Sequence, residues 1–118
     1  MTKKQNYTWT QFGHDAKCIA RMLKNRRETF DGVWGPARGG LPLAVAMSHF
    51  LNIPFCKKPK SRKTLIVDDI ADTGKTLLKY AETHTIATLF YHTQSVFEPN
   101  IWLRKKTNKW IVFPWENI

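Results

Sequence analysis

The segment TLIVDDIADTGKT, residues 64–76, constrains the fold more than any other part of the chain. It opens with a continuous apolar run rich in β-branched residues, which is typical of a strand covered on both faces of a parallel sheet. Asp68 and Asp69 end this run, and Asp72 follows shortly before Gly74. The whole chain has only 9 acidic residues, so a cluster of three carboxylates here needs a specific explanation.

Helices and strands are expected to alternate along the chain. Thr8 and Gln11 have the spacing of a capping box, which predicts the start of a helix. The apolar residues that follow at helical spacing are Phe12, Ala16, Ile19, Ala20 and Leu23. Two further helices are expected over residues 41–51 and 75–84, and strands over residues 30–36, 53–56, 64–69, 85–91 and 110–113.

This alternation predicts an α/β fold with a mostly parallel sheet flanked by helices. With 118 residues, the chain has room for a single domain, residues 1–118. In open α/β sheets, ligands bind at the carboxyl ends of the strands. Two turns with unusual residues are expected at this edge: Ala37-Arg38-Gly39-Gly40 after the first strand, and residues 68–76 after the third.

The second of these turns offers two kinds of ligand group. It is not a P-loop, because position 69 is aspartate where that motif requires glycine. Hydroxyls and backbone N–H groups of residues 72–76, expected at a helix N-terminus, suit a single phosphate. Asp68 and Asp69 suit the vicinal hydroxyls of a ribose, directly or through Mg²⁺, which takes hard oxygen ligands. The two carboxylates and the phosphate-binding turn would then contact different parts of one ligand.

Each feature also has a purely structural interpretation. An aspartate at the end of a strand is often a turn residue or a helix cap, and an Arg-Gly-Gly sequence can be a simple flexible turn. These interpretations stay open for each residue taken alone. The coincidence of both turns at matching strand ends favours a ligand site.

Residues 64–76 resemble the signature of the type I phosphoribosyltransferases, which is an apolar strand, two acids, two spacers and Asp-Thr-Gly-x-Thr. GVWGPARGGLPLA, residues 32–44, resembles the pyrophosphate loop of that family and the helix after it. WIVFPWE, residues 110–116, is similar to the C-terminal Trp-Ile and Pro-Trp-acid pattern of the bacterial xanthine–guanine enzymes. The resemblance implies the type I phosphoribosyltransferase fold with a reduced hood, the small cap beside the main sheet.

The implied reaction is transfer of phosphoribosyl from phosphoribosyl pyrophosphate (PRPP) to guanine, xanthine or hypoxanthine in purine salvage, with Mg²⁺ and release of pyrophosphate. The implied general base, near purine N7, is Asp72. The other implied contacts are the 5′-phosphate with Asp72, Thr73, Gly74, Lys75 and Thr76, the ribose and Mg²⁺ with Asp68 and Asp69, the pyrophosphate with Ala37, Arg38, Gly39 and Gly40, and the base with His92, Trp110 and Ile111.

Two places depart from the family pattern. The long loop that closes over PRPP in the family is replaced by KKPKSRK, residues 57–63, which is too short to serve as a lid. His92 stands where the family has a lysine that recognises the purine 6-oxo group, and an imidazole can also donate to that oxygen. The alternatives are that His92 is a surface residue and that Trp110 is an ordinary core aromatic.

The net charge of +10 fits a polyanionic partner or a solvated basic surface. Loss of the lid leads to the alternative function, a non-catalytic nucleotide- or PRPP-binding regulatory protein on the same fold, whose basic loop would then be available to contact RNA. Nucleic acid is not the expected partner, because no aromatic residues interleave with the charges of residues 57–63.

The remaining sequence features indicate a protein of the cytoplasm. No apolar run reaches the roughly 20 residues of a membrane-spanning helix, and the N-terminal residues lack an apolar core of signal-peptide length. Cys18 and Cys56 have no metal-ligand spacing and are expected to be reduced thiols. Because relatives associate, a homo-oligomer, either a dimer or a tetramer, is expected.

Overall fold

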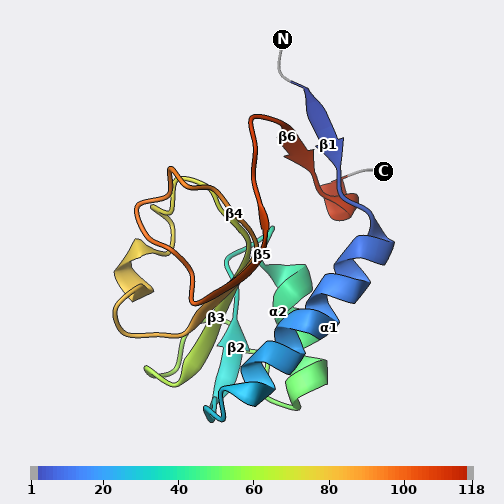
Figure 1. Cartoon of the computed structure of the whole chain (residues 1–118). Coiled ribbons are helices and arrows are strands. Elements are labelled where there is room, and N and C mark those ends of the chain that lie inside the picture. The colour runs from blue at the N-terminus through green and yellow to red at the C-terminus, as the bar shows by residue number, and fades with distance from the viewer. Residues whose placement is uncertain (1–2, 117–118) are drawn as a thin grey trace.

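A computed structural model describes residues 3–116 of the chain. Four parallel strands form the main sheet in the order β2-β3-β4-β5 (Figure 1). These strands are β2 (Gly32–Trp34), β3 (Thr64–Ala71), β4 (Ile86–Tyr91) and β5 (Ile101–Lys105). Helices α1 (Trp9–Asn25) and α2 (Leu41–Leu51) lie together against one face of this sheet (Figure 1). The predicted α/β fold with a parallel sheet is confirmed.

Local signals define both helices. At the start of α1, the Gln11 amide donates to Thr8 Oγ1 at 3.1 Å, and the Thr8 amide donates to Gln11 Oε1 at 2.9 Å. The predicted capping box is therefore present, and it satisfies amides that have no partner within the helix. Helix α2 spans the predicted residues, with Pro42 in its first turn. Asn52 caps its C-terminus with a left-handed φ of 53°.

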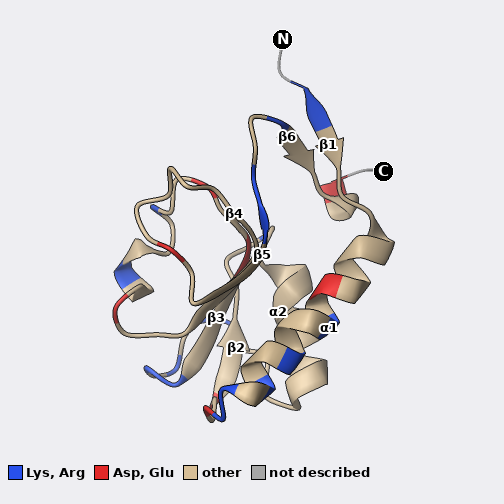
Figure 2. Ribbon diagram, viewed as in Figure 1, with Lys and Arg blue, Asp and Glu red and all other residues tan. Residues whose placement is uncertain are grey.

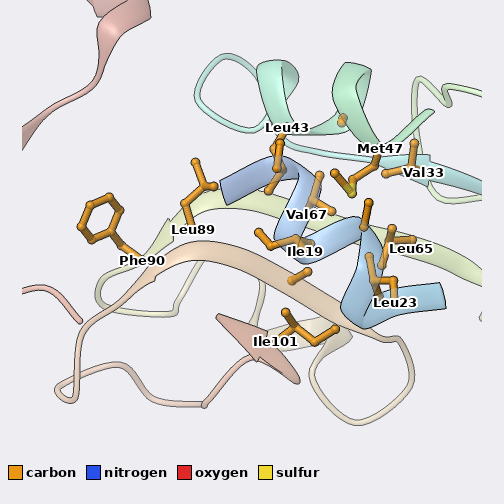
Figure 3. Close-up of a cluster of buried hydrophobic side chains, with 14 of the residues drawn as sticks. Ile19, Leu23, Val33, Leu43, Met47, Leu65, Val67, Leu89, Phe90 and Ile101 are labelled. Carbon is orange, nitrogen blue, oxygen red and sulfur yellow. The ribbon is translucent and has the colours of Figure 1, made fainter. Parts of the chain in front are cut away.

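Apolar side chains cover β3 on both faces. Leu65 and Val67 pack with Ile19 and Leu23 of α1 on the face that the helices cover (Figure 3). Ile66, between them in the chain, packs instead with Leu77 and Ile86. Successive residues of a strand point to opposite faces of the sheet, so this division confirms that β3 is covered on both faces.

Two predicted elements are absent from the described residues. The expected strand over residues 53–56 makes only an isolated bridge between Phe55 and Val33, in part because Pro54 has no N–H to donate to a ladder. The expected helix over residues 75–84 is a series of turns around a single 3₁₀ turn, η1 (Leu78–Tyr80). Tertiary contacts determine the path of this segment, since the Tyr80 ring makes edge contacts with Trp34 and His84.

A second, two-stranded parallel sheet stands apart from the main one (Figure 1). It pairs β1 (Lys4–Asn6) with β6 (Trp110–Val112), and the 3₁₀ turn η2 (Pro114–Glu116) follows. Strand β6 was expected from the sequence, whereas β1 and β5 were not. These terminal segments form the small cap expected beside the main sheet.

A buried ionic network joins α1 to β5. Asp15 accepts hydrogen bonds from the Tyr7 hydroxyl at 2.5 Å and from Arg104 Nε at 2.6 Å. Burial and the neighbouring Asp15 carboxylate raise the pKa of Tyr7 far above its usual range, so the phenol stays protonated and donates. Across residues 3–116, no helix combines the length and the apolar character needed to cross a bilayer.

Candidate functional site

The carboxyl ends of three neighbouring strands lie side by side. Ala71 of β3 is in register with Tyr91 of β4, which is in register with Lys105 of β5. The hydrogen bonding continues one residue further, since the His92 amide donates to Ala71 O at 3.0 Å and the Lys106 amide donates to Tyr91 O at 2.9 Å. This register brings together the residues that follow the three strands, namely Asp72, His92 and Lys106.

Asp68 and Asp69 lie inside β3 and are largely withdrawn from solvent. Asp68 is 9% exposed, and its Oδ1 accepts a hydrogen bond from the Asp69 amide at 2.8 Å. Burial, followed by the charge of Asp69, raises the pKa of Asp68 to about 9. Burial also raises the pKa of Asp69, and the Glu116 carboxylate contributes to this. The pair therefore favours a ligand that brings positive charge or donates hydrogen bonds.

These carboxylates fit a magnesium ion shared with substrate. Among residues 3–116, no group of three or more His, Cys, Asp or Glu side chains is arranged to hold a metal by itself. Mg²⁺ usually keeps several waters and is held by one or two carboxylates together with substrate phosphates. Asp68 and Asp69 supply that number of carboxylates, and the burial that raises the pKa of both would favour a bound cation.

The turn after β3 encloses a cavity of about 230 Å³. Its lining comprises Asp68, Asp69, Ile70, Ala71, Asp72, Thr73, Gly74, Thr76, Leu77 and Phe97. Gly74 has a φ of +80°, and a β-carbon there would collide with Ser95 Oγ. Glycine is thus required both for the backbone conformation and for the close approach of Ser95.

This geometry corrects one part of the expected phosphate site. No α-helix follows Gly74, so a helix N-terminus cannot provide the anion site expected there. The groups that remain are the backbone amides of the turn and the hydroxyls of Thr73 and Thr76. Lys75 is exposed and adds a positive charge to the turn.

The turn after β2 lies against the acidic pair. A β-carbon on Gly39 would overlap the Asp69 carboxylate, which places the two turns in direct contact. Ala37 and Arg38 are exposed beside Gly39, and their peptide bond is cis. A second, more open cavity of about 1150 Å³ runs along this turn. Its lining is Trp9, Phe12, Arg38, Gly39, Leu41, Pro42, Val45, Asp69, Trp115 and Glu116.

Asp72 has two nitrogen-bearing neighbours. His92 Nδ1 lies 2.9 Å from Asp72 Oδ1, and Lys106 Nζ lies 4.0 Å from the same oxygen. The His92 side chain is 18% exposed, so it is partly covered and not freely solvated, and its role in recognition of the base stays a prediction. Lys106 was not among the residues expected from the sequence. Recognition of β5 and its register with β4 would have found it, because Lys106 directly follows that strand.

The structure does not bring the C-terminal base-binding candidates into either cavity. Trp110 is 57% exposed, so its interpretation as a core aromatic is wrong. Ile111 is buried in the main core. Instead, Trp115 and Glu116 from the same segment line the larger cavity beside Asp69. The Pro-Trp-acid sequence was noted as part of a pattern, but the sequence did not indicate that its side chains reach the acidic pair.

The basic loop, residues 57–63, lies at the opposite end of the sheet. Asp31, which directly precedes β2, accepts hydrogen bonds from the Ser61 hydroxyl at 2.5 Å and the Thr64 hydroxyl at 2.7 Å. His84 Nε2 is 2.9 Å from Ser61 O on the other side of the loop. Figure 2 shows the Lys and Arg residues of this loop near the C-terminal end of α1, at the amino ends of the strands. The loop is therefore anchored where it cannot cover Asp72.

Comparisons with known proteins agree with this geometry. No family model matches the chain. The purine phosphoribosyltransferase of Pyrococcus horikoshii Ot3 superposes with a TM-score of 0.82 and 34% sequence identity, over 99% of this chain and 96% of that one. The Helicobacter pylori xanthine-guanine-hypoxanthine phosphoribosyltransferase, 19% identical, superposes with a TM-score of 0.76 over 96% and 94% of the two chains, which shows a shared fold.

A curated relative is similar over part of its length. The orotate phosphoribosyltransferase of Thermococcus kodakarensis is 33% identical in an alignment 84 positions long, and the match covers 57% of this chain and 45% of that enzyme. The chain therefore spans less than half the length of this relative. The Pyrococcus and Thermococcus proteins carry names for different bases, a purine and orotate.

Proposed function

The chain belongs to the type I phosphoribosyltransferase family, and from this premise we propose that it transfers phosphoribosyl from PRPP to a 6-oxopurine base. One observation carries the proposal. The acidic pair lines one cavity together with all residues of the turn 72–76 except Lys75, and Gly39 of the other turn touches Asp69. A single ligand with a ribose between two phosphate groups would satisfy all three features. The Pyrococcus relative, similar over nearly its whole length, is named for purines.

Each part of PRPP has a proposed partner. The 5′-phosphate would be bound by Asp72, Thr73, Gly74, Lys75 and Thr76, and the pyrophosphate by Ala37, Arg38, Gly39 and Gly40. The ribose hydroxyls would face Asp68 and Asp69. Mg²⁺, when bound with PRPP, would neutralise charge on the pyrophosphate and on these carboxylates. The nearby carboxylates would also stabilise positive charge that develops on the ribose in the transition state.

In the proposed reaction, a ring nitrogen of the base forms a bond to the ribose carbon C1. The bond between C1 and the pyrophosphate oxygen breaks, and the pyrophosphate leaves with the electron pair. The base must lose a proton, which the Asp72 carboxylate accepts near purine N7. Asp72 is suited to this role because its side chain is 43% exposed at the cavity. His92, 2.9 Å from its Oδ1, would hold the carboxylate in place.

We further propose that the base lies beside Asp72 and His92, with Trp110 and Ile111 available for stacking and backbone contacts. Trp110 has the exposure that stacking requires. A homo-oligomer, a dimer or a tetramer, fits the exposed apolar side chains of Trp9, Val45 and Phe50. The proposed setting is purine salvage in the cytoplasm.

The anchored loop supports a second candidate function. Closure of a site excludes water and so favours transfer to a base over hydrolysis. Residues 57–63 are held at the other end of the sheet by Asp31 and cannot provide that closure. A protein that binds PRPP or a nucleotide without turnover would fit this arrangement, with the basic loop free to contact RNA.

An assay with PRPP, Mg²⁺ and single bases separates these candidates. Guanine, xanthine, hypoxanthine, adenine and orotate are each supplied, and the nucleotide product is measured by chromatography. The Asp72→Asn variant should lower kcat by roughly 10²- to 10⁴-fold, as expected for loss of a general base. Glu82→Gln, an exposed carboxylate outside both cavities, is the matched control. No product from any base, with PRPP still bound, would favour the non-catalytic candidate.

A further inference from the structure

We propose that Lys106 recognises the oxygen at position 6 of the purine and thereby selects a 6-oxopurine over adenine. This inference rests on the proposed function, because it requires the base to lie beside Asp72. It goes further by assigning the discrimination between bases to a residue outside every motif found in the sequence. It is argued from three observations: the position of Lys106, the partners of its ammonium group and the chemistry of its neighbours.

Lys106 is held firmly at the end of β5. Its amide donates to Tyr91 O at 2.9 Å, which continues the pairing of β5 with β4. Its side chain is 14% exposed, whereas the Asp72 side chain is 43% exposed. The Lys106 side chain is therefore more buried than the Asp72 side chain, and its backbone position is set by the pairing with β4.

The ammonium group keeps a donor available for a ligand. Lys106 Nζ lies 4.0 Å from Asp72 Oδ1 and 3.5 Å from the carbonyl oxygen of Thr107. A lysine ammonium has three N–H donors and no acceptor. Thr107 O is within hydrogen-bonding distance and Asp72 Oδ1 is only an ion-pair contact, so the ammonium keeps at least one N–H group for a ligand atom that approaches Asp72.

The chemistry of a purine places its position 6 near this donor. Position N7 and the substituent at position 6 lie next to each other on one edge of the ring. When Asp72 faces N7, the substituent at position 6 falls beside the neighbours of Asp72, which are His92 and Lys106. An oxo group accepts a hydrogen bond from an ammonium, whereas the amino group of adenine is itself a donor and is opposed by one.

His92 cannot make this distinction by itself. Its Nδ1 faces Asp72 Oδ1 at 2.9 Å, which leaves Nε2 for other contacts. When the ring is neutral, Nε2 accepts and would suit the amino group of adenine; when the ring is protonated, Nε2 donates and would suit an oxo group. Lys106 can only donate, so it favours the oxo group whichever form His92 takes.

Nucleotide binding tests this assignment without any turnover. The affinities of IMP and AMP are measured by calorimetry for the wild type and for Lys106→Met, Lys106→Gln and Lys106→Arg. The wild type should bind IMP more tightly. Loss of a charged donor should reduce the preference for IMP roughly 10- to 100-fold in Lys106→Met. Lys106→Gln should also lose preference because an amide can accept from adenine, and Lys106→Arg should keep it.

Lys105→Met is the matched control. Lys105 is the last residue of β5, directly before Lys106, and it is exposed. Successive residues of an extended chain point to opposite faces of the sheet. Its replacement should leave the ratio of IMP to AMP affinity unchanged. Thermal unfolding of each variant verifies that it is folded, and Lys106→Gln serves if Lys106→Met is not.

Two results would overturn the assignment. One is equal binding of IMP and AMP by the wild type. The other is an unchanged ratio in both neutral variants, and if both affinities also fall by the same factor, Lys106 only holds Asp72 in place. Absence of product in the PRPP assay, together with a ratio that depends on Lys106, would instead refute the proposed catalysis and leave the recognition role intact.

Discussion

Replacement of Asp68 by asparagine should stabilise the free protein. Asp68 is 9% exposed, and burial next to Asp69 raises its pKa to about 9. In the unfolded chain the same carboxyl has a pKa of about 3.9. Because the folded pKa is the higher one, stability is fully present below about pH 4 and is lost as the pH rises from there towards about pH 9.

The size of this effect follows from the separation of the two pKa values. The raised pKa means that the folded protein should keep Asp68 protonated at pH 7. This pH is about three units above the pKa of the unfolded chain, and each unit is worth about 1.36 kcal/mol. The upper limit of the cost is therefore about 4 kcal/mol. Asparagine avoids this cost, and its amide oxygen can still accept the hydrogen bond from the Asp69 amide that Asp68 Oδ1 now accepts.

Urea unfolding at several pH values measures the effect. The advantage of Asp68→Asn over the wild type should grow steadily between pH 5 and pH 8, by up to about 4 kcal/mol. Glu82→Gln, which removes an exposed carboxylate, should show no such growth. Parallel stability curves for Asp68→Asn and the wild type would refute the argument, because Asp68 would then be ionised in the folded protein. In the proposed site, the same variant should weaken the Mg²⁺ dependence of PRPP binding.

Two further substitutions test the turn after β3 and the buried ionic network. Gly74→Ala should weaken PRPP binding about tenfold or more in calorimetry, because alanine resists the φ of +80° and its β-carbon meets Ser95 Oγ. Adding Ser95→Ala should restore part of the affinity. Unchanged binding by the single variant would contradict the assigned turn. Asp15→Ala should lower the free energy of unfolding, measured by urea unfolding, by about 3 kcal/mol, because Arg104 and the Tyr7 hydroxyl lose their shared acceptor. A loss below about 1 kcal/mol would show that solvent replaces Asp15.

The parts of the fold that local chemistry controls were predictable from the sequence. The capping box of Thr8 and Gln11, the helix over residues 41–51 and the strand that carries the acidic pair all follow from neighbouring residues. The meeting of the two turns was also predictable, because parallel strands place their carboxyl ends at one edge. Contact between Gly39 and Asp69 bears out that expectation.

Elements that depend on distant contacts were not predictable in the same way. Residues 75–84 have the composition of a helix, yet the Tyr80 ring packs against Trp34 and the segment forms turns. Strand β5 carries Arg104 and Lys105 at the edge of the sheet, so it lacks the continuous apolar run that identified β3 and β4. Arg104 is instead stabilised by Asp15, 89 positions away in the sequence.

The same distinction explains why the sequence indicates Asp72 and not Lys106. Asp72 belongs to a contiguous motif, and its role can be considered from its neighbours alone. Lys106 reaches Asp72 only because Ala71, Tyr91 and Lys105 are in register across three strands. No local pattern encodes that register, which arises when β5 pairs with β4. With the proposed role of Lys106, the residue that selects the base could change at the end of β5 while the phosphate-binding motif stays the same, and one scaffold could then serve different bases.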